Sequence, residues 1–275
     1  MTRLRIGVIG HVEHVTLGTV AALPGAGDIA HLQGPHVIPG GGGGIAFHQL
    51  VRSDAEVHLF TALGGDEAAR VVEAALATTG AVIHAARRSA PHTRDVVMID
   101  PAGERTIVVV GEPLHPRADD ALPYELLGAL DAVYFTAQDP ALLARARAAR
   151  VLVATARRQD CIRASQVALD AIVGSRSDPR EASALADYPV APRALVMTAG
   201  PRGGTIEAAD GTRRFATPIV DRVVGSYGAG DSFAGALTYG LAAGLSIEDA
   251  CARAAVCAAA VLRGIDPLAA QIACS

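Results

Sequence analysis

One acidic residue stands where this sequence could both bind an anion and move a proton. In the segment GSYGAGDSF (residues 225–233), Asp231 follows Gly228 and Gly230, and small residues follow it. Glycines let a ligand approach the main chain closely, and the first N–H groups of a helix attract anions. Asp231 is therefore either a helix cap, which is common for aspartate, or a catalytic base beside a bound anion. The two glycines and the lack of bulk nearby favour the base.

Phosphoryl transfer is the chemistry that suits this arrangement. In such reactions a protein mainly positions the reactants and stabilises charge, and it does little covalent work. A carboxylate need only accept the proton of the attacking hydroxyl group. The glycine-flanked N–H groups would hold the phosphoryl oxygens, so the segment predicts a kinase-type site.

Two other segments contain residue types that bind ligands. The run Gly40–Gly44 lacks the Lys and Ser/Thr of a P-loop, and five glycines alone are typical of a flexible connector. Its place before the predicted helix IAFHQLVR favours a substrate-facing loop. His11, Glu13 and His14 suggest a metal site, but one H-x-x-H without a further ligand is a weak zinc signal. We expect solvent or substrate contacts there.

Composition restricts the class of protein. Of 275 residues, 51% are hydrophobic but only 4% are aromatic, so small aliphatic side chains must build the core, as in a layered α/β protein. The net charge of −4 and the scattered Lys and Arg argue against nucleic-acid binding. The four cysteines show no metal or disulfide spacing and are expected to be reduced. No signal peptide and no apolar run of roughly 20 residues is present, which predicts a cytoplasmic protein without a membrane partner.

Strand and helix patterns alternate along the chain. Short apolar runs predict buried parallel strands at 5–10, 56–63, 131–137, 151–155, 170–175 and 194–199. Helical patterns with capping residues lie at 66–80, 139–150 and 246–264. Two segments break the alternation: a hairpin at 93–110 around DPAGE, and an extended segment at 27–40. We assign both to a small β excrescence beside a mostly parallel sheet. A second hairpin turns at Asp210–Gly211.

The motifs resemble those of the ribokinase-like, or PfkB-type, carbohydrate kinases. The segment GSYGAGDSF is similar to the family's D-T-x-G-A-G-D-x-F signature, with Gly225 in place of the earlier Asp. LVMTAGPRGG resembles the T-x-G-x-x-G segment, IPGGGGGIAFHQLV the N-terminal G-G motif, and MIDPAGERTIVV the lid strands. The resemblance implies a three-layer α/β/α fold with a mostly parallel central sheet and a small β lid. It also implies a single domain, residues 1–275, with lid strands inserted from about 12–38 and 92–111.

The resemblance also implies roles for individual residues. Asp231 would be the base that activates the acceptor hydroxyl. The N–H groups of Gly228, Ala229 and Gly230 would form the anion hole, and ATP with Mg²⁺ would be the donor. Further implied residues are Thr198, Gly200, Gly203 and Ala258 for the nucleotide, Glu13, Gly41, Gly42, Ile45 and Asp231 for the acceptor, and Asp178 or Glu181 for Mg²⁺.

Departures from the family pattern concentrate in the acceptor half. Val15 stands where an Asp is usual, Ile45 where an Asn is usual, and SRSDPREA replaces the N-x-x-E motif. We therefore predict an ATP-dependent kinase of a sugar or sugar-like alcohol without naming the acceptor. Two alternatives stay open: a nucleoside kinase of the same fold, disfavoured by the scarcity of aromatic residues near the site, and a catalytically silent small-molecule binder. A homodimer joined through the lid is also expected from the resemblance.

Overall fold

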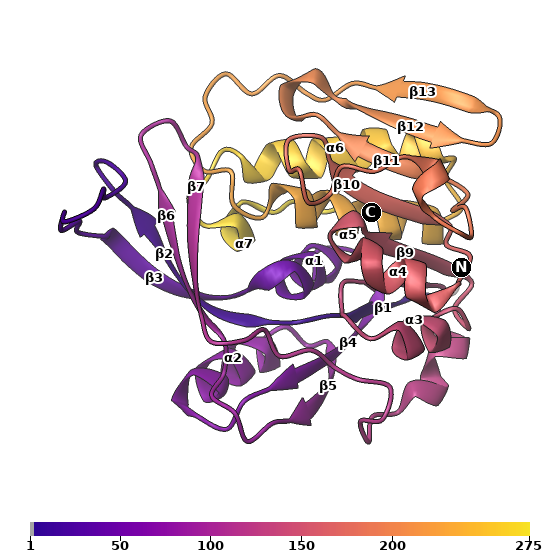
Figure 1. Cartoon of the computed structure of the whole chain (residues 1–275), viewed down its shortest axis with the longest axis horizontal. Helices are drawn as coiled ribbons and strands as arrows, with labels where there is room; N and C mark the ends of the chain where they lie inside the picture. Colours follow the sequence, from indigo (N-terminus) through magenta and orange to yellow (C-terminus); the bar gives the residue numbers. More distant parts are fainter. Residues whose placement is uncertain (1–2) are drawn as a thin grey trace.

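A nine-stranded, mostly parallel sheet runs through the molecule (Figure 1). The structure, a computed structural model, describes residues 3–275. From one edge to the other the strands are β13 (Gly211–Phe215), β12 (Gly204–Ala208), β11 (Leu195–Thr198), β10 (Ala171–Ser175), β9 (Val151–Thr155), β8 (Ala132–Phe135), β1 (Arg5–Ile9), β4 (Glu56–Leu63) and β5 (Val82–Arg87). Neighbouring strands are parallel from β5 to β11. The hairpin β12–β13 adds two antiparallel strands at one edge.

Helices cover both faces of this sheet. One face packs against α1 (Gly41–Val51), α2 (Glu67–Ala77), α5 (Ala229–Ala242) and α6 (Ile247–Val261). The other packs against η1 (Tyr124–Ala129), α3 (Pro140–Ala146) and α4 (Gln159–Ser165). The short elements η2 (Ala156–Arg158), η3 (Leu185–Asp187), η4 (Gly200–Arg202) and α7 (Pro267–Ala270) complete the chain. The predicted three-layer α/β/α fold is confirmed.

Capping residues and small side chains explain the local structure. Asp139 caps α3 by accepting from the N–H groups of Ala141 and Leu142, and Pro140 occupies the first helical position. Between α5 and α6, a Cβ on Gly240 would lie 2.9 Å from the Cβ of Ala250. The helices approach this closely because their contact surface is built from glycine and alanine, which is how a core with few aromatic residues stays packed.

A separate four-stranded sheet projects from one end of the main sheet, at the left of Figure 1. Its order is β3 (Gln33–Gly40), β2 (Glu13–Thr19), β6 (Arg94–Ile99) and β7 (Arg105–Val110). The strands β2 and β6 pair in parallel, although about eighty residues separate them, and each forms an antiparallel pair with its outer neighbour. We call this sheet the lid. Its strands fall near the two segments that the sequence assigned to the β excrescence.

Some elements differ from the expectation. The helix α1 begins at Gly41, so four of the five glycines belong to its first turn and do not form a flexible loop. The strand β5 was not predicted, because its side chains are mostly half-buried at the sheet edge and show no continuous apolar run. All four cysteines are buried and unpaired, as expected. Within residues 3–275, no helix is both long and apolar enough to cross a bilayer.

Candidate active site

Polar side chains gather where the parallel strands end. The strand β1 leads to His11, β8 to Thr136, β9 to Arg157 and Arg158, and β10 to Asp178. In open α/β sheets, ligands bind at this carboxyl edge. Because the strand order is β11-β10-β9-β8-β1, the residues near β1 and those after β11 lie at opposite ends of one row.

The helix α5 carries Asp231 in its first turn. Gly228 is the N-cap residue, with a φ of 81°, and no side chain caps this helix. The first helical hydrogen bond runs from the Ser232 N–H to the Gly228 carbonyl. Within the described residues, the N–H groups of Gly228, Ala229 and Gly230 donate no hydrogen bond. Asp231 is therefore not the cap, and three N–H groups are available for an anion.

Two glycines of this turn serve different purposes. A Cβ on Gly228 would lie 2.9 Å from the Cβ of Pro267 and 3.1 Å from the Ile45 Cγ2, so glycine is required there by packing and by its positive φ. A Cβ on Gly230 would meet nothing within 4 Å, and Gly230 is exposed. The space beside Gly230 is therefore open from outside the protein.

The surroundings of Asp231 make its carboxylate a stronger base. Desolvation raises its pKa to about 7, and the negative charge of Glu181 adds to the rise. Arg105 and Arg157 oppose this shift. A base whose pKa lies near neutral pH is half ionised there and retains the driving force to accept a proton.

Gly42, near the start of α1, faces Asp231 directly. A Cβ on Gly42 would lie 3.1 Å from Oδ1 of Asp231, 3.3 Å from Oγ1 of Thr136 and 3.4 Å from Cε1 of His11. The Gly42 N–H donates to Nε2 of His11 over 3.2 Å. Gly41 lies against the carboxyl group of Glu13, with 2.9 Å between its would-be Cβ and Oε2, and its N–H donates to the Tyr227 hydroxyl. We call Gly41 and Gly42 the glycine floor, since polar groups surround a position left free of side chains.

A second carboxyl group lies beside Glu13. Asp95, in the lid strand β6, is 3% exposed, and its Oδ1 is buried without a hydrogen-bond partner. Burial, a hydrogen bond with Asp95 and the negative charges of Asp95 and Asp231 raise the pKa of Glu13 to about 9. Burial thus favours the protonated form of Glu13. Sequence reasoning missed Asp95, although its alternation with the buried Val97 and Ile99 indicated an inward-facing acid.

Ile45 was also predicted to bind the acceptor, but its side chain is apolar and offers no hydrogen bond. Its side chain is 0% exposed and packs with Val15, Ile38 and Tyr227 at the base of the lid. Val15, which replaces the usual Asp, belongs to the same apolar cluster. The two departures noted in the sequence thus form one hydrophobic contact.

Three of the four predicted nucleotide residues lie around the end of β11. The hydroxyl group of Thr198 donates to the Gly174 carbonyl, and Gly200 is exposed with a φ of 57°. Gly203 is buried, and a Cβ there would lie 2.0 Å from the Phe215 carbonyl oxygen, which gives this glycine a packing role. Ala258, on α6, is partly buried against the core. The site residues therefore extend from the glycine floor at one end to Thr198 at the other.

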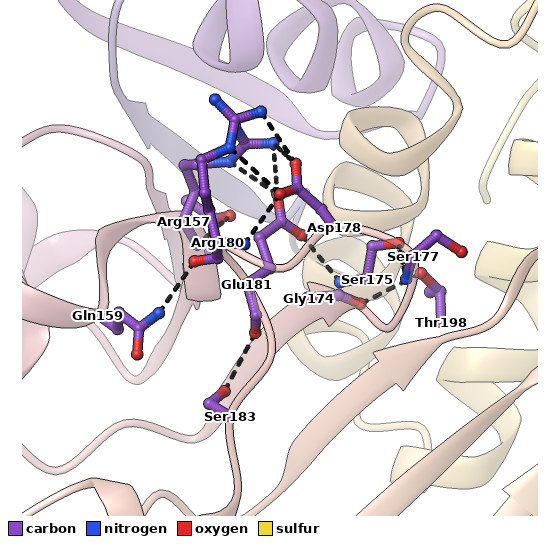
Figure 2. A network of polar contacts seen from close by, with 11 residues as sticks. Arg157, Gln159, Gly174, Ser175, Ser177, Asp178, Arg180, Glu181, Ser183 and Thr198 are labelled. Carbon is purple, nitrogen blue, oxygen red and sulfur yellow. Dashed lines mark hydrogen bonds and ion pairs between the residues drawn. The ribbon is translucent and has the colours of Figure 1, made fainter. Parts of the chain in front are cut away.

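The predicted metal ligands are already occupied by arginine (Figure 2). Arg157 donates to Asp178 over 2.6 Å and to Glu181 over 2.9 Å, and Arg180 also pairs with Asp178. Glu181 accepts from the Ser175 N–H as well. Within residues 3–275, no three His, Cys, Asp or Glu side chains are arranged to hold a metal ion. Guanidinium groups pair with both carboxylates in this structure, and the assignment of Mg²⁺ to Asp178 and Glu181 stays a prediction.

Comparisons with solved structures support the fold. A protein from Agrobacterium tumefaciens described as a ribokinase superimposes with a TM-score of 0.84 at 23% identity, covering 99% of this chain and 95% of its own. Arabidopsis thaliana ribokinase, solved with ribose and ATP, superimposes with a TM-score of 0.75 at 15% identity. The match covers 100% of this chain and 97% of the ribokinase. The adenosine kinase of Sinorhizobium meliloti superimposes with a TM-score of 0.76 at 15% identity. The match covers 97% of this chain and 96% of the adenosine kinase.

Sequence comparison identifies the family. No curated protein sequence matches the chain. The family model of the pfkB family carbohydrate kinases matches residues 118–268, which is more than half of the chain and includes the segment around Asp231. The chain belongs to the pfkB family of carbohydrate kinases.

Proposed function

We propose that this protein transfers the γ-phosphoryl group of ATP to a hydroxyl group of a sugar or sugar-like alcohol. The observation that carries the proposal is the junction between Asp231 and the glycine floor. Three unpaired N–H groups, a base with a raised pKa and a position free of side chains meet there. These are the parts that phosphoryl transfer needs from a protein.

In the proposed reaction the acceptor hydroxyl lies over Gly42, beside Oδ1 of Asp231. Its oxygen forms a bond to the γ-phosphorus while the bond from that phosphorus to the bridging oxygen of ADP breaks. The hydroxyl proton passes to Asp231. The N–H groups of Gly228, Ala229 and Gly230 donate to the transferred phosphoryl oxygens, where negative charge is spread.

ATP is the expected donor for a kinase of this family, and we place its phosphates between the α5 N-terminus and the end of β11. Mg²⁺ would arrive on the phosphate oxygens of the nucleotide, since Mg²⁺ keeps several water ligands and relies on substrate phosphates. The role assigned to the protein rests on its own N–H groups and Asp231.

The acceptor end favours a polyhydroxylated compound over a nucleoside. Glu13 and Asp95 offer carboxyl oxygens that suit hydroxyl groups. Phe47 is the aromatic residue nearest in the sequence to the glycine floor. Its side chain is fully buried in the core and offers no face to a nucleobase. Structural neighbours include both sugar and nucleoside kinases, so a nucleoside acceptor is the alternative to be tested.

The test is ADP formation from ATP and magnesium across a panel of sugars, sugar acids, sugar phosphates and nucleosides. Asp231→Asn should lower kcat by about 10²- to 10⁴-fold while nucleotide binding is retained. Asp249→Asn is a matched control, because Asp249 occupies the same position in the first turn of α6 but bonds to the Ser246 hydroxyl. A wild-type protein that binds ATP but phosphorylates nothing would support the silent binder. Undiminished turnover in Asp231→Asn would refute the mechanism.

We also propose that two copies pair through the lid. The edge strand β7 exposes four consecutive aliphatic residues, Ile107 to Val110, which are between 40% and 51% exposed. An unpaired apolar edge invites association with another strand, and a second copy supplies an identical one. Light scattering should show a dimer for the wild type and a monomer for Val109→Glu. A monomeric wild type at micromolar concentration would contradict this.

A further inference from the structure

Two adjacent arginines at the end of β9 differ in their charge partners. Arg157 lies between Asp178 and Glu181, so its charge is neutralised by two carboxylates (Figure 2). Arg158 forms no ion pair with any carboxylate of the described residues, although it is only partly exposed to solvent. A cation that loses water without gaining a carboxylate lowers the stability of the folded protein. The described residues therefore supply no carboxylate that balances the charge of Arg158.

The hydrogen bonds of Arg158 leave one end of its guanidinium group unused. Nε donates to the Thr136 carbonyl over 3.0 Å, and Nη2 lies 3.5 Å from Nε2 of His115. Nη1 has no partner among the described residues, and it is absent from the buried unpaired atoms, so solvent reaches it. Burial lowers the pKa of Arg158, yet a guanidinium keeps its charge at any physiological pH.

The groups around Arg158 are donors or are uncharged. His11 accepts from the Gly42 N–H through Nε2, so its Nδ1 carries the proton, and that atom is buried without a partner. The ring of His115 meets that of His11 edge to face, with centroids 4.9 Å apart, and its Nδ1 also lacks a partner. Burial lowers the pKa of both rings, which keeps them neutral.

The remaining neighbours do not supply a negative charge at neutral pH. Glu13 is the carboxylic acid whose charge acts on the pKa of Arg158, and burial raises the pKa of Glu13 to about 9, which favours its protonated form. Burial raises the pKa of the Tyr134 hydroxyl and of the Cys161 thiol, so both stay neutral. Arg157 adds positive charge. The region thus has a surplus of donors and positive charge.

This region adjoins the position assigned to the acceptor. Thr136, whose carbonyl holds Arg158, is the residue whose hydroxyl lies beside Gly42 and Asp231. His11 contacts both the glycine floor and His115. A substrate that presents a hydroxyl group to Asp231 can therefore extend toward Arg158.

We infer that the acceptor carries an anionic group, a carboxylate or a phosphate monoester, and that Nη1 of Arg158 binds it. A guanidinium is suited to both groups, which it binds through parallel N–H donors. The inference rests on the proposed kinase function and narrows its substrate class to sugar acids and sugar phosphates.

Binding without turnover tests this. In the Asp231→Asn protein, calorimetry should show gluconate, glucuronate, ribose 5-phosphate or fructose 6-phosphate binding at least about tenfold more tightly than the matching neutral sugar. Arg158→Gln in the same background should remove this preference, a loss of about 10- to 100-fold, and leave ATP affinity unchanged. Arg158→Lys should retain part of it, because the charge stays and the fork is lost. Whether the acids or the phosphates bind separates the two anion types.

Several outcomes would overturn the inference. These are neutral sugars binding as tightly as the anions, no anion binding at millimolar concentration, or Arg158→Gln weakening ATP and not the acceptor. Turnover of neutral sugars by the wild type would remove the anionic acceptor but keep the kinase. Arg193→Gln is the control for charge removal, because the Arg193 side chain is 85% exposed and precedes β11, away from the carboxyl ends of the strands. Arg158→Gln should not lower Tm, whereas Arg157→Gln should, because it leaves Asp178 and Glu181 without their shared partner.

Discussion

The two ends of the site are built from different parts of the chain. At the proposed phosphoryl end, the groups expected to bind are the unpaired main-chain N–H groups of Gly228, Ala229 and Gly230, which come from one short segment. At the proposed acceptor end, the side chains of Glu13 on β2, His11 after β1 and Thr136 after β8 lie against the glycine floor. Both ends meet at Asp231.

This difference suits the two parts of the proposed reaction. A phosphoryl group is the same whatever the acceptor, so main-chain N–H groups of a glycine-rich turn suffice to bind it. An acceptor differs from one enzyme to another, and side chains drawn from distant strands can be exchanged without disturbing the helix α5. Mutations should therefore affect the two ends in different ways.

The largest effect should come from Gly230→Ala at the phosphoryl end. The new methyl group would enter the open space beside the N–H groups, so kcat should fall by about 100-fold or more, because small misplacements of reacting groups are costly. The Tm should stay the same, since the methyl group touches nothing in the protein.

Gly228→Ala provides the contrast for this experiment. It should lose stability, because φ is positive and Pro267 blocks the new Cβ. Full activity in Gly230→Ala would show that the phosphoryl group does not lie against this turn.

A smaller effect is expected from Gly42→Ala at the acceptor end. Its Cβ would crowd Asp231, Thr136 and His11, so KM for the acceptor should rise by about 10- to 100-fold, while KM for ATP stays unchanged. Gly128→Ala is a suitable control, since its Cβ would make only an ordinary contact, 3.9 Å from Ala148. A rise in KM for ATP alone would assign the glycine floor to the phosphoryl end.

The smallest effect should be the pH dependence of Asp231, where the two ends meet. The base acts when ionised, and its pKa is about 7, so kcat/KM should fall about tenfold for each pH unit below that value. A profile that is flat between pH 5 and 8 would contradict the role of Asp231.

The same shift affects stability with the opposite sign. The folded state favours the protonated form, so the penalty is absent below the unfolded pKa near 4 and complete above pH 7. Asp231→Asn should therefore raise Tm at pH 8 relative to the wild type and have little effect at acid pH. Equal Tm values at pH 8 would indicate an unshifted carboxyl group.

The turn and the helix that carry Asp231 could be predicted from the sequence because their signals are local. Glycine spacing, a following helix and an acid in the first turn occupy a few consecutive residues. The hairpin at 93–110 is likewise recognisable from neighbouring residues. The acceptor end could not be predicted in the same way. Asp95 meets Glu13 only because β6 pairs in parallel with β2, a contact between distant segments.

The ion pairs of the site could not be predicted from the sequence either. Asp178 and Glu181 have the residue types of metal ligands, and only the position of Arg157 in space shows that they form ion pairs. Arg158 follows in the next position and matches no motif, and it forms no ion pair with a carboxylate of residues 3–275. A residue type indicates possible chemistry, and the neighbours decide which of the possibilities is used.

The turn of the lid reaches the segment that precedes Asp231. The carbonyl of Gly103, between β6 and β7, accepts from the Ser226 N–H over 2.9 Å. Glycine is required at this position because its φ is 81° and because Val223 leaves no room for a Cβ. A main-chain hydrogen bond thus connects the lid, which we propose covers the acceptor, to the segment that precedes Asp231. A movement of the lid would therefore also displace the segment that precedes Asp231.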